Sequence, residues 1–163
     1  AAYGGDSAQT LTTPGGAPIH ATTTIAEAHA QWSWRGLELR VLGARAEVDD
    51  VAAINRALGF TGAASVGEEL GGYYVELGYD LLTLLAEGGE QSLTPFVRWE
   101  SYDTQAAVPA GFAADPSNNV DILTVGLAWQ PFSQGIVKLD FQNHKNGAGT
   151  ATDQFNVALG YIF

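Results

Sequence analysis

Apolar and polar residues alternate along most of this chain, and the alternation is clearest in the segment 153–163. Every second residue of that segment has a large apolar or aromatic side chain, namely Phe155, Val157, Leu159, Tyr161 and Phe163. We call these positions the apolar parity of a strand. The residues between them are small or polar and form the polar parity. Because successive side chains of a β-strand point to opposite faces, the segment is predicted to be a strand with one apolar and one polar face.

The same two-residue period predicts six further strands. They are expected at residues 22–34, 37–47, 71–85, 93–103, 121–132 and 136–145. Short, glycine-containing connections at 35–36, 87–90 and 133–135 are typical of β-hairpins. Longer connections at 48–70 and 104–120 alternate with them, and residues 1–19 are expected to form a leading loop. A short helix is predicted at 49–59, because two aspartates precede an apolar stretch and a glycine follows it.

Most charges of the predicted strands fall on the polar parity. The titratable residues there are candidates to line one face of the sheet: Glu27, His29, Glu38, Arg40, Glu76, Asp80, Arg98, Glu100, Lys138 and Asp140. Two pairs of opposite charge, Arg98 with Glu100 and Lys138 with Asp140, lie two residues apart and are expected to neutralise each other in part. Arg45 falls on the apolar parity, so it lies beyond the apolar stretch or follows a bulge near Gly43.

Composition narrows the fold and the function. The 163 residues suit one domain, and no run of eighteen apolar residues exists that could form a membrane-spanning helix. A net charge of −11 disfavours binding to nucleic-acid phosphates, and the absence of cysteine excludes a thiolate metal site. The histidines lack metal-ligand spacing and no nucleophile motif is present, so neither a metal or other cofactor nor an enzymatic activity is expected. A soluble β-sandwich also has alternating strands, so alternation leaves both an aqueous and a membrane fold open.

The segments 71–80, 93–100 and 153–163 resemble the carboxyl-terminal part of bacterial outer-membrane porins. The nearest family is that of the phosphate-selective porins O and P, or relatives of it. The resemblance implies an all-β fold, a transmembrane antiparallel β-barrel whose short turns are periplasmic and whose longer loops (1–19, 48–70 and 104–120) are extracellular. About seven strands would then form the carboxyl-terminal portion of a single barrel domain of about 16–18 strands. An eight-stranded barrel with an irregular first strand near 8–13 is the alternative.

The resemblance also implies partners and a location. The protein is expected in the bacterial outer membrane as a homotrimer in contact with lipid, and Tyr161 and Phe163 would form the signal read by the barrel-assembly machinery. Aromatic residues near strand ends are expected to form an interfacial girdle: Trp32, Trp34, Tyr79, Trp129 and Phe163.

The expected function is a water-filled channel for passive diffusion of small solutes or ions. Phosphate selectivity is not expected, because acidic residues outnumber basic ones on the polar parity, and such an excess favours cations. The alternative is a structural or adhesive barrel that tethers the envelope or binds partners through its loops.

Overall fold

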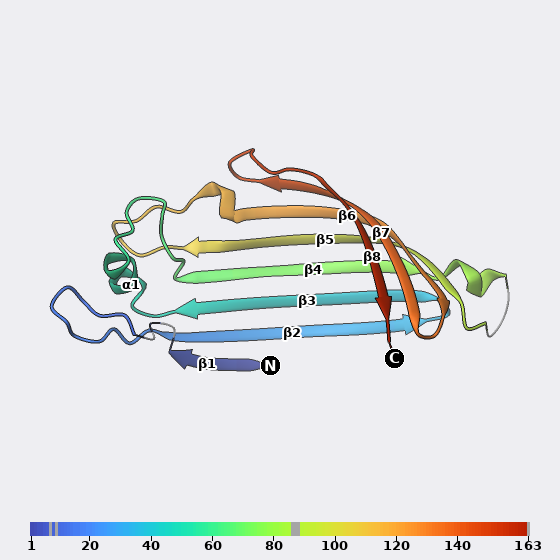
Figure 1. Cartoon of the computed structure of the whole chain (residues 1–163), viewed down its shortest axis with the longest axis horizontal. Helices are drawn as coiled ribbons and strands as arrows, with labels where there is room; N and C mark the ends of the chain where they lie inside the picture. Colours follow the sequence, from blue (N-terminus) through green and yellow to red (C-terminus); the bar gives the residue numbers. More distant parts are fainter. Residues whose placement is uncertain (7, 9, 86–88, 163) are drawn as a thin grey trace.

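The computed structural model describes residues 1–162 with the exception of 7, 9 and 86–88. The described strands form one antiparallel sheet in chain order (Figure 1). They are β1 (Ala2–Asp6), β2 (Thr22–Trp34), β3 (Leu37–Val48), β4 (Glu69–Tyr79), β5 (Ser92–Ala107), β6 (Asn119–Phe132), β7 (Gly135–Asn146) and β8 (Gln154–Tyr161). Helix α1 (Val51–Ala57) and two short 3₁₀ helices, η1 (Leu81–Leu84) and η2 (Pro116–Asn118), lie in the connections.

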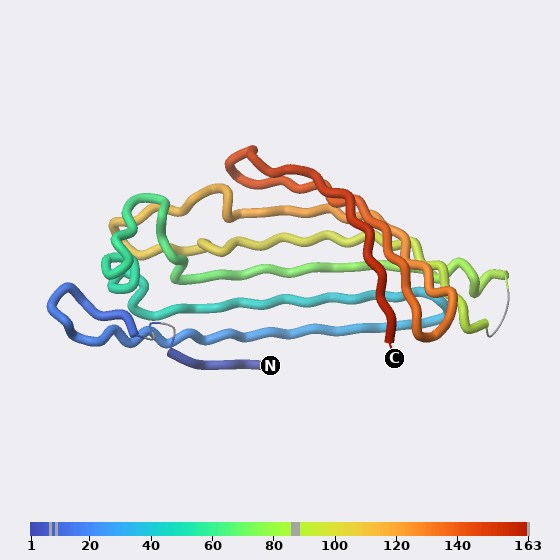
Figure 2. Tube along the Cα trace, in the orientation of Figure 1, coloured from blue at the N-terminus to red at the C-terminus, as the bar shows by residue number. Residues whose placement is uncertain are grey.

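The sheet has two unlike ends. At the loop end, on the left of Figure 1, lie α1 and the connection that carries η2. At the turn end lie the hairpins 35–36 and 133–134 and the connection 80–91. Figure 2 shows that β7 and β8 run at a steep angle to β2–β6, as expected for a sheet that twists and curls. The strands β1 and β8 form the two edges, so the sheet is open.

The all-β antiparallel fold predicted from the sequence is confirmed, but the number of strands is not seven. The described residues form eight strands, since Ala2–Asp6 lies within the segment 1–19 predicted as a loop. This first strand precedes the segment 8–13 in which the alternative placed it. Its two central glycines favour loops, and what makes it a strand is pairing with β2, from Ala2 opposite Ala26 to Asp6 opposite Thr22.

The strand predicted at 71–85 ends early, at Tyr79. Asp80 stops it, because its Oδ1 accepts hydrogen bonds from the backbone N–H of Leu82 (3.1 Å) and of Leu93 (2.9 Å). The first bond caps η1 and the second holds the start of β5 beside it. The described part of this connection at 80–85 is therefore folded, and the turn predicted at 87–90 lies partly outside the described residues. Within the described part of the chain, no helix is long and apolar enough to cross a membrane.

A small hydrophobic core lies at the loop end. The buried residues Ala8, Ile19, Ala21 and Ile54 form it, and they join the first connection to α1. The helix itself was predicted, but its N-cap residue Asp50 makes no side-chain capping bond and adopts a left-handed conformation (φ 52°).

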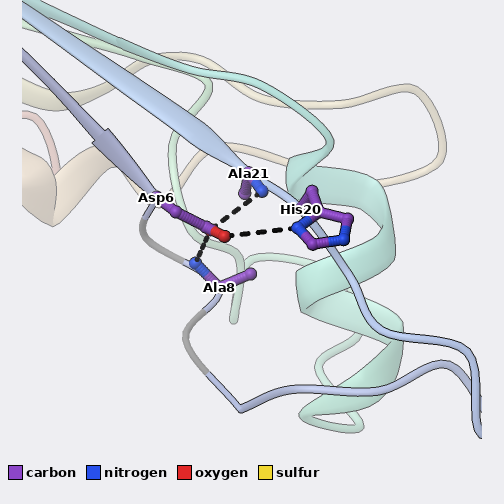
Figure 3. A network of polar contacts seen from close by, with 4 residues as sticks. All are labelled: Asp6, Ala8, His20 and Ala21. Carbon is purple, nitrogen blue, oxygen red and sulfur yellow. Dashed lines mark hydrogen bonds and ion pairs between the residues drawn. The ribbon is translucent and has the colours of Figure 1, made fainter.

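The carboxylate of Asp6 closes the first connection onto the start of β2 (Figure 3). Its Oδ1 accepts hydrogen bonds from the N–H of Ala8 (2.9 Å) and of Ala21 (3.1 Å), and its Oδ2 lies 3.4 Å from Nδ1 of His20. One side chain thus ties together the two ends of the segment that packs on α1.

Two long loops are also joined to each other. Asn55 is fully buried in α1, where its amide bonds the hydroxyl of Ser65 (2.8 Å) and the N–H of Val66 (2.9 Å). Gln105 donates to the carbonyl of Ser65 and accepts from the N–H of Asp115 (2.6 Å). The hydrogen bond from the N–H of Ser117, together with that from its hydroxyl, lowers the pKa of the Asp115 carboxyl. The loop end is consequently a folded unit with its own polar network.

Within the sheet, an aromatic ring fills the space above a glycine. Phe96 of β5 lies opposite Gly126 of β6 and is 8% exposed. A Cβ at Gly126 would overlap the Phe96 ring and would lie 2.7 Å from the carbonyl oxygen of Leu139. Gly43 of β3 is different, because a Cβ there would meet no atom within 4 Å.

We predict that Gly126→Ala destabilises the sheet by roughly 1–3 kcal/mol, because the added methyl group forces the Phe96 ring or the β7 backbone to move. Gly43→Ala is the matched control and should change stability by less than about 1 kcal/mol. Urea denaturation of both variants, monitored by tryptophan fluorescence, measures the difference. Equal stability of the two variants would show that the Phe96 contact does not constrain the sheet.

Candidate functional site: the polar face of the sheet

One row of polar residues crosses the sheet from β2 to β8. Each member lies directly opposite the next in the strand register, and the row runs through Gln31, Arg40, Glu76, Arg98, Thr124, Gln142 and Gln154. Because the row follows the hydrogen-bonding direction of the backbone, its side chains all point to the same face. We call this set the polar row.

Arg40 is the centre of the first charged group in this row. Its Nη1 donates to Oε1 of Glu76 and its Nη2 donates to Oε2 of Glu38, both at 2.8 Å. The Glu76 side chain is 12% exposed, whereas that of Glu38 is 38% exposed. One guanidinium therefore holds two carboxylates, and the group carries a net negative charge.

Arg98 forms the second charged group. Its Nη2 donates to Oε1 of Glu100 at 2.7 Å, and its guanidinium lies 4.0 Å from the centre of the Tyr74 ring. The predicted pairing of Arg98 with Glu100 is thus confirmed. Its Nε and the hydroxyl of the neighbouring Thr124 are buried and have no hydrogen-bond partner among the described residues.

Lys138 and Asp140, in contrast, have other partners than each other. The Lys138 ammonium lies 4.4 Å from the centre of the Phe96 ring. Asp140 is 7% exposed and accepts a hydrogen bond from Nδ2 of Asn156 on β8 (2.8 Å). The sequence predicted that these two charges neutralise each other in part, but Lys138 lies on an aromatic ring of β5 and Asp140 is bonded by an amide of β8.

The remaining predicted residues lie at the margins of this face or outside it, and Tyr161 is on the apolar face of β8. Glu27 and His29 form a pair on β2, with 2.5 Å between Oε1 and Nδ1. Asp80 is separated from the others, because its carboxylate caps η1 and binds the start of β5 as described above. Tyr161 ends β8 and packs edge-on against Phe132, with ring centres 6.5 Å apart. Phe163 lies outside the described residues.

The opposite face of the sheet is apolar and exposed. Many of its large side chains are exposed, from Leu127 (37%) to Leu159 (80%). Arg45 lies on this face, and the register on both sides of Gly43 continues without a bulge. Arg45 bonds Glu47 and Glu69, both at 3.0 Å, beyond the last apolar residue of this face on β3. The bulge that the sequence left open is therefore ruled out.

The loop-end limit of this apolar band varies from strand to strand. The row that contains Tyr73 continues through Ser101, Asp121 and Lys145, so it is apolar on β4 and polar from β5 to β7. On β5 and β6 the last apolar residues of this face are Trp99 and Leu123, which lie in the row of Val75. On β7 the last apolar residue is Phe141, four residues from Lys145.

The candidates predicted from the sequence were the titratable residues of the polar face, and its uncharged residues were not among them. Gln31, Thr124, Gln142 and Gln154 belong to the polar row, yet none of them is titratable. The two-residue period puts them on this face, but which residues lie opposite one another depends on the alignment of the strands, which the sequence does not state. The contacts of Arg98 with Tyr74 and of Lys138 with Phe96 depend on the same alignment, because each joins residues of different strands.

Comparison with known proteins adds one distant relative. No protein-family model matches the chain, and no solved structure matches it. An uncharacterized protein of Aquifex aeolicus (strain VF5) is 26% identical over 140 residues. The matched part covers 83% of this chain and only 32% of that relative.

We predict that the Arg98–Glu100 pair stabilises the sheet more than the Arg45–Glu47 pair. The side chains of the first pair are 29% and 22% exposed, and those of the second are 59% and 55% exposed. Double-mutant cycles with Arg→Met and Glu→Gln should give a coupling energy of about 1–2 kcal/mol for the first pair and below about 1 kcal/mol for the second. Coupling energies in the reverse order would contradict the assignment of Arg98 to a partly dehydrated face.

Proposed function

We propose that these strands form part of the wall of an outer-membrane β-barrel that acts as a passive channel for small solutes or ions. One observation carries the proposal. A single sheet has an exposed apolar face on one side and a charged, hydrogen-bonded face on the other. A wall between lipid and an aqueous lumen requires this arrangement, because lipid faces one parity and water faces the other.

A soluble β-sandwich explains the two faces less well. In a sandwich the apolar face of one sheet is covered by a second sheet about 10 Å away. Here all eight described strands belong to the same sheet, and residues such as Val125 (55% exposed) and Val157 (62% exposed) stay uncovered. Exposed apolar surface on this scale is typical of a membrane or partner contact.

A further feature supports a membrane wall. Aromatic side chains gather at the turn end, where Trp32 and Trp34 stack with ring centres 6.3 Å apart and Arg35 lies 5.1 Å from the Trp34 ring centre. Tryptophan and arginine of this kind are suited to the interface between acyl chains and headgroups.

The charges of the polar face favour cations. With Asp80 engaged at the turn end, the carboxylates of this face are Glu27, Glu38, Glu76, Glu100 and Asp140, against the cations Arg40, Arg98 and Lys138. The excess is acidic, and an acidic lumen raises the local concentration of cations. Salt screens the field of these carboxylates beyond about 8 Å at physiological ionic strength, so the selectivity depends on how narrow the lumen is.

A structural or adhesive barrel is the second candidate, and the folded loop end favours it. Helix α1 has a buried attachment through Val51 and Asn55, while Leu58 and Phe60 just after it are 45% and 37% exposed. An ordered loop with exposed apolar side chains could bind a partner outside the cell. The absence of ion conductance in the reconstituted intact protein would favour this candidate.

We predict that Trp99 and Trp129 contact lipid near the two limits of the apolar band. Variants of the reconstituted protein that retain only one of these tryptophans should be quenched by brominated lipids, more strongly by bromine near the headgroups than at the acyl ends. Aqueous iodide should quench them weakly. Strong iodide quenching without lipid quenching would rule out the membrane wall.

We predict a preference for cations, which reversal potentials across a planar bilayer under a salt gradient measure. Arg40→Gln should increase the preference, because it releases Glu38 and Glu76, and Glu76→Gln should decrease it. Arg45→Gln, on the apolar face, is the control and should have a smaller effect. An anion preference of the intact channel, or equal effects of the three variants, would contradict the assignment of these charges to the lumen.

A further inference from the structure

The polar face is not polar along its whole length. Towards the loop end, the rows beyond the polar row carry mainly apolar residues: Ile25, Leu42, Ala44, Ala46, Leu70, Tyr102, Val120 and Ile122. These residues share the parity of Arg40 and Arg98, so in the proposed barrel they face the lumen rather than lipid. A lumen wall that serves only ions and polar solutes does not need such a zone.

The apolar zone contains an open surface pocket of about 320 Å³, which we call the cavity. Its lining includes Ile25, Leu42, Leu70, Tyr74 and Tyr102 from four neighbouring strands. This volume is at the lower end of the range for small-molecule sites, which are mostly apolar with few polar groups. Gly72 in the lining allows Tyr102 to lie close to β4, because a Cβ at Gly72 would lie 2.6 Å from Cβ of Tyr102.

One charged pair borders this cavity on the side of the polar row. Glu100 belongs to the cavity lining, and it accepts the hydrogen bond from Arg98. The Arg98 guanidinium lies on the ring of Tyr74, which is also part of the lining. A solute in this open pocket would therefore contact apolar side chains of the sheet and would have the Arg98–Glu100 pair at the edge nearest the polar row, while Arg45 and Asp103 belong to the lining towards the loop end.

We infer that this cavity binds small amphiphilic solutes, with the apolar part in the cavity and the charged part at the Arg98–Glu100 pair. The complementarity is best for a zwitterion that carries both an ammonium and a carboxylate beside an apolar side group. The inference rests on the proposed channel and adds a substrate class to it. Burial of each methylene group strengthens binding about fourfold, so the apolar part decides the preference.

Leucine and asparagine are suitable probes, because they are similar in size, both zwitterionic, and differ in the polarity of the side chain. The intact protein is reconstituted into lipid vesicles, and uptake of each radiolabelled amino acid is measured as a function of concentration. At low concentration leucine uptake should exceed asparagine uptake by at least about fourfold, since one additional buried methylene group has this effect. Leucine uptake should saturate, while asparagine uptake should rise linearly.

Leu42→Asn and Leu70→Asn should each reduce the ratio of leucine to asparagine uptake to near one. Ala128→Asn is the matched control, because it lies on the same face towards the turn end and does not line this cavity. Circular dichroism and sodium conductance of each variant check that it has folded, and Tyr102→Ser replaces either leucine variant that fails this check.

The outcomes separate the two levels of the proposal. Vesicles that conduct sodium but take up leucine and asparagine equally would overturn the amphiphile site and leave the channel intact. An unchanged preference in the leucine variants, together with a loss in Ala128→Asn, would also overturn it. Vesicles without conductance for any ion would overturn the channel, and the site with it.

Discussion

The hydrogen-bond register between neighbouring strands is the constraint on which the rest of this structure depends. Side chains alternate with a period of two, so a slip of one residue would move every side chain of a strand to the other face. From β2 to β8 the register keeps the polar row together, and it places Arg40 opposite Glu76 and Arg98 opposite Thr124. The ion pairs, the stacked rings and the apolar band all follow from this alignment rather than from a buried core.

The consequence is a protein whose stability is distributed over the sheet. The few buried apolar side chains lie mainly at the loop end, around Ile54, and the strands themselves bury little apart from Phe96 and Ile122. About half the surface of its large apolar side chains stays exposed, so burial within the sheet contributes little to its stability. In the proposed membrane wall, contact with lipid would cover this surface.

The alternation of apolar and polar residues depends on neighbouring positions in the chain, so it predicted strands and turns that consecutive residues form. The strand at 22–34 and the two-residue turn after it agree with the prediction, because Trp34 and Leu37 belong to adjacent strands with a glycine between them. The first strand escaped prediction, since its pairing with β2 joins residues more than fifteen positions apart. The end of β4 was missed for a similar reason: Asp80 binds Leu93 of the next strand, and no pattern within β4 reveals that bond. The candidate site was predicted as a set of charges, whereas its partners, its uncharged members and the apolar cavity depend on register.

The central claim is that one parity of this sheet faces lipid and the other faces water. Because the chain contains no cysteine, single cysteines can be introduced at each position from 123 to 129 of β6 and spin-labelled in the reconstituted protein. The account predicts high accessibility to molecular oxygen and low accessibility to a water-soluble nickel chelate at 123, 125, 127 and 129, with the reverse at 124, 126 and 128. Accessibility without this two-residue period, or protection of the odd positions from both reagents as in a buried protein core, would contradict it.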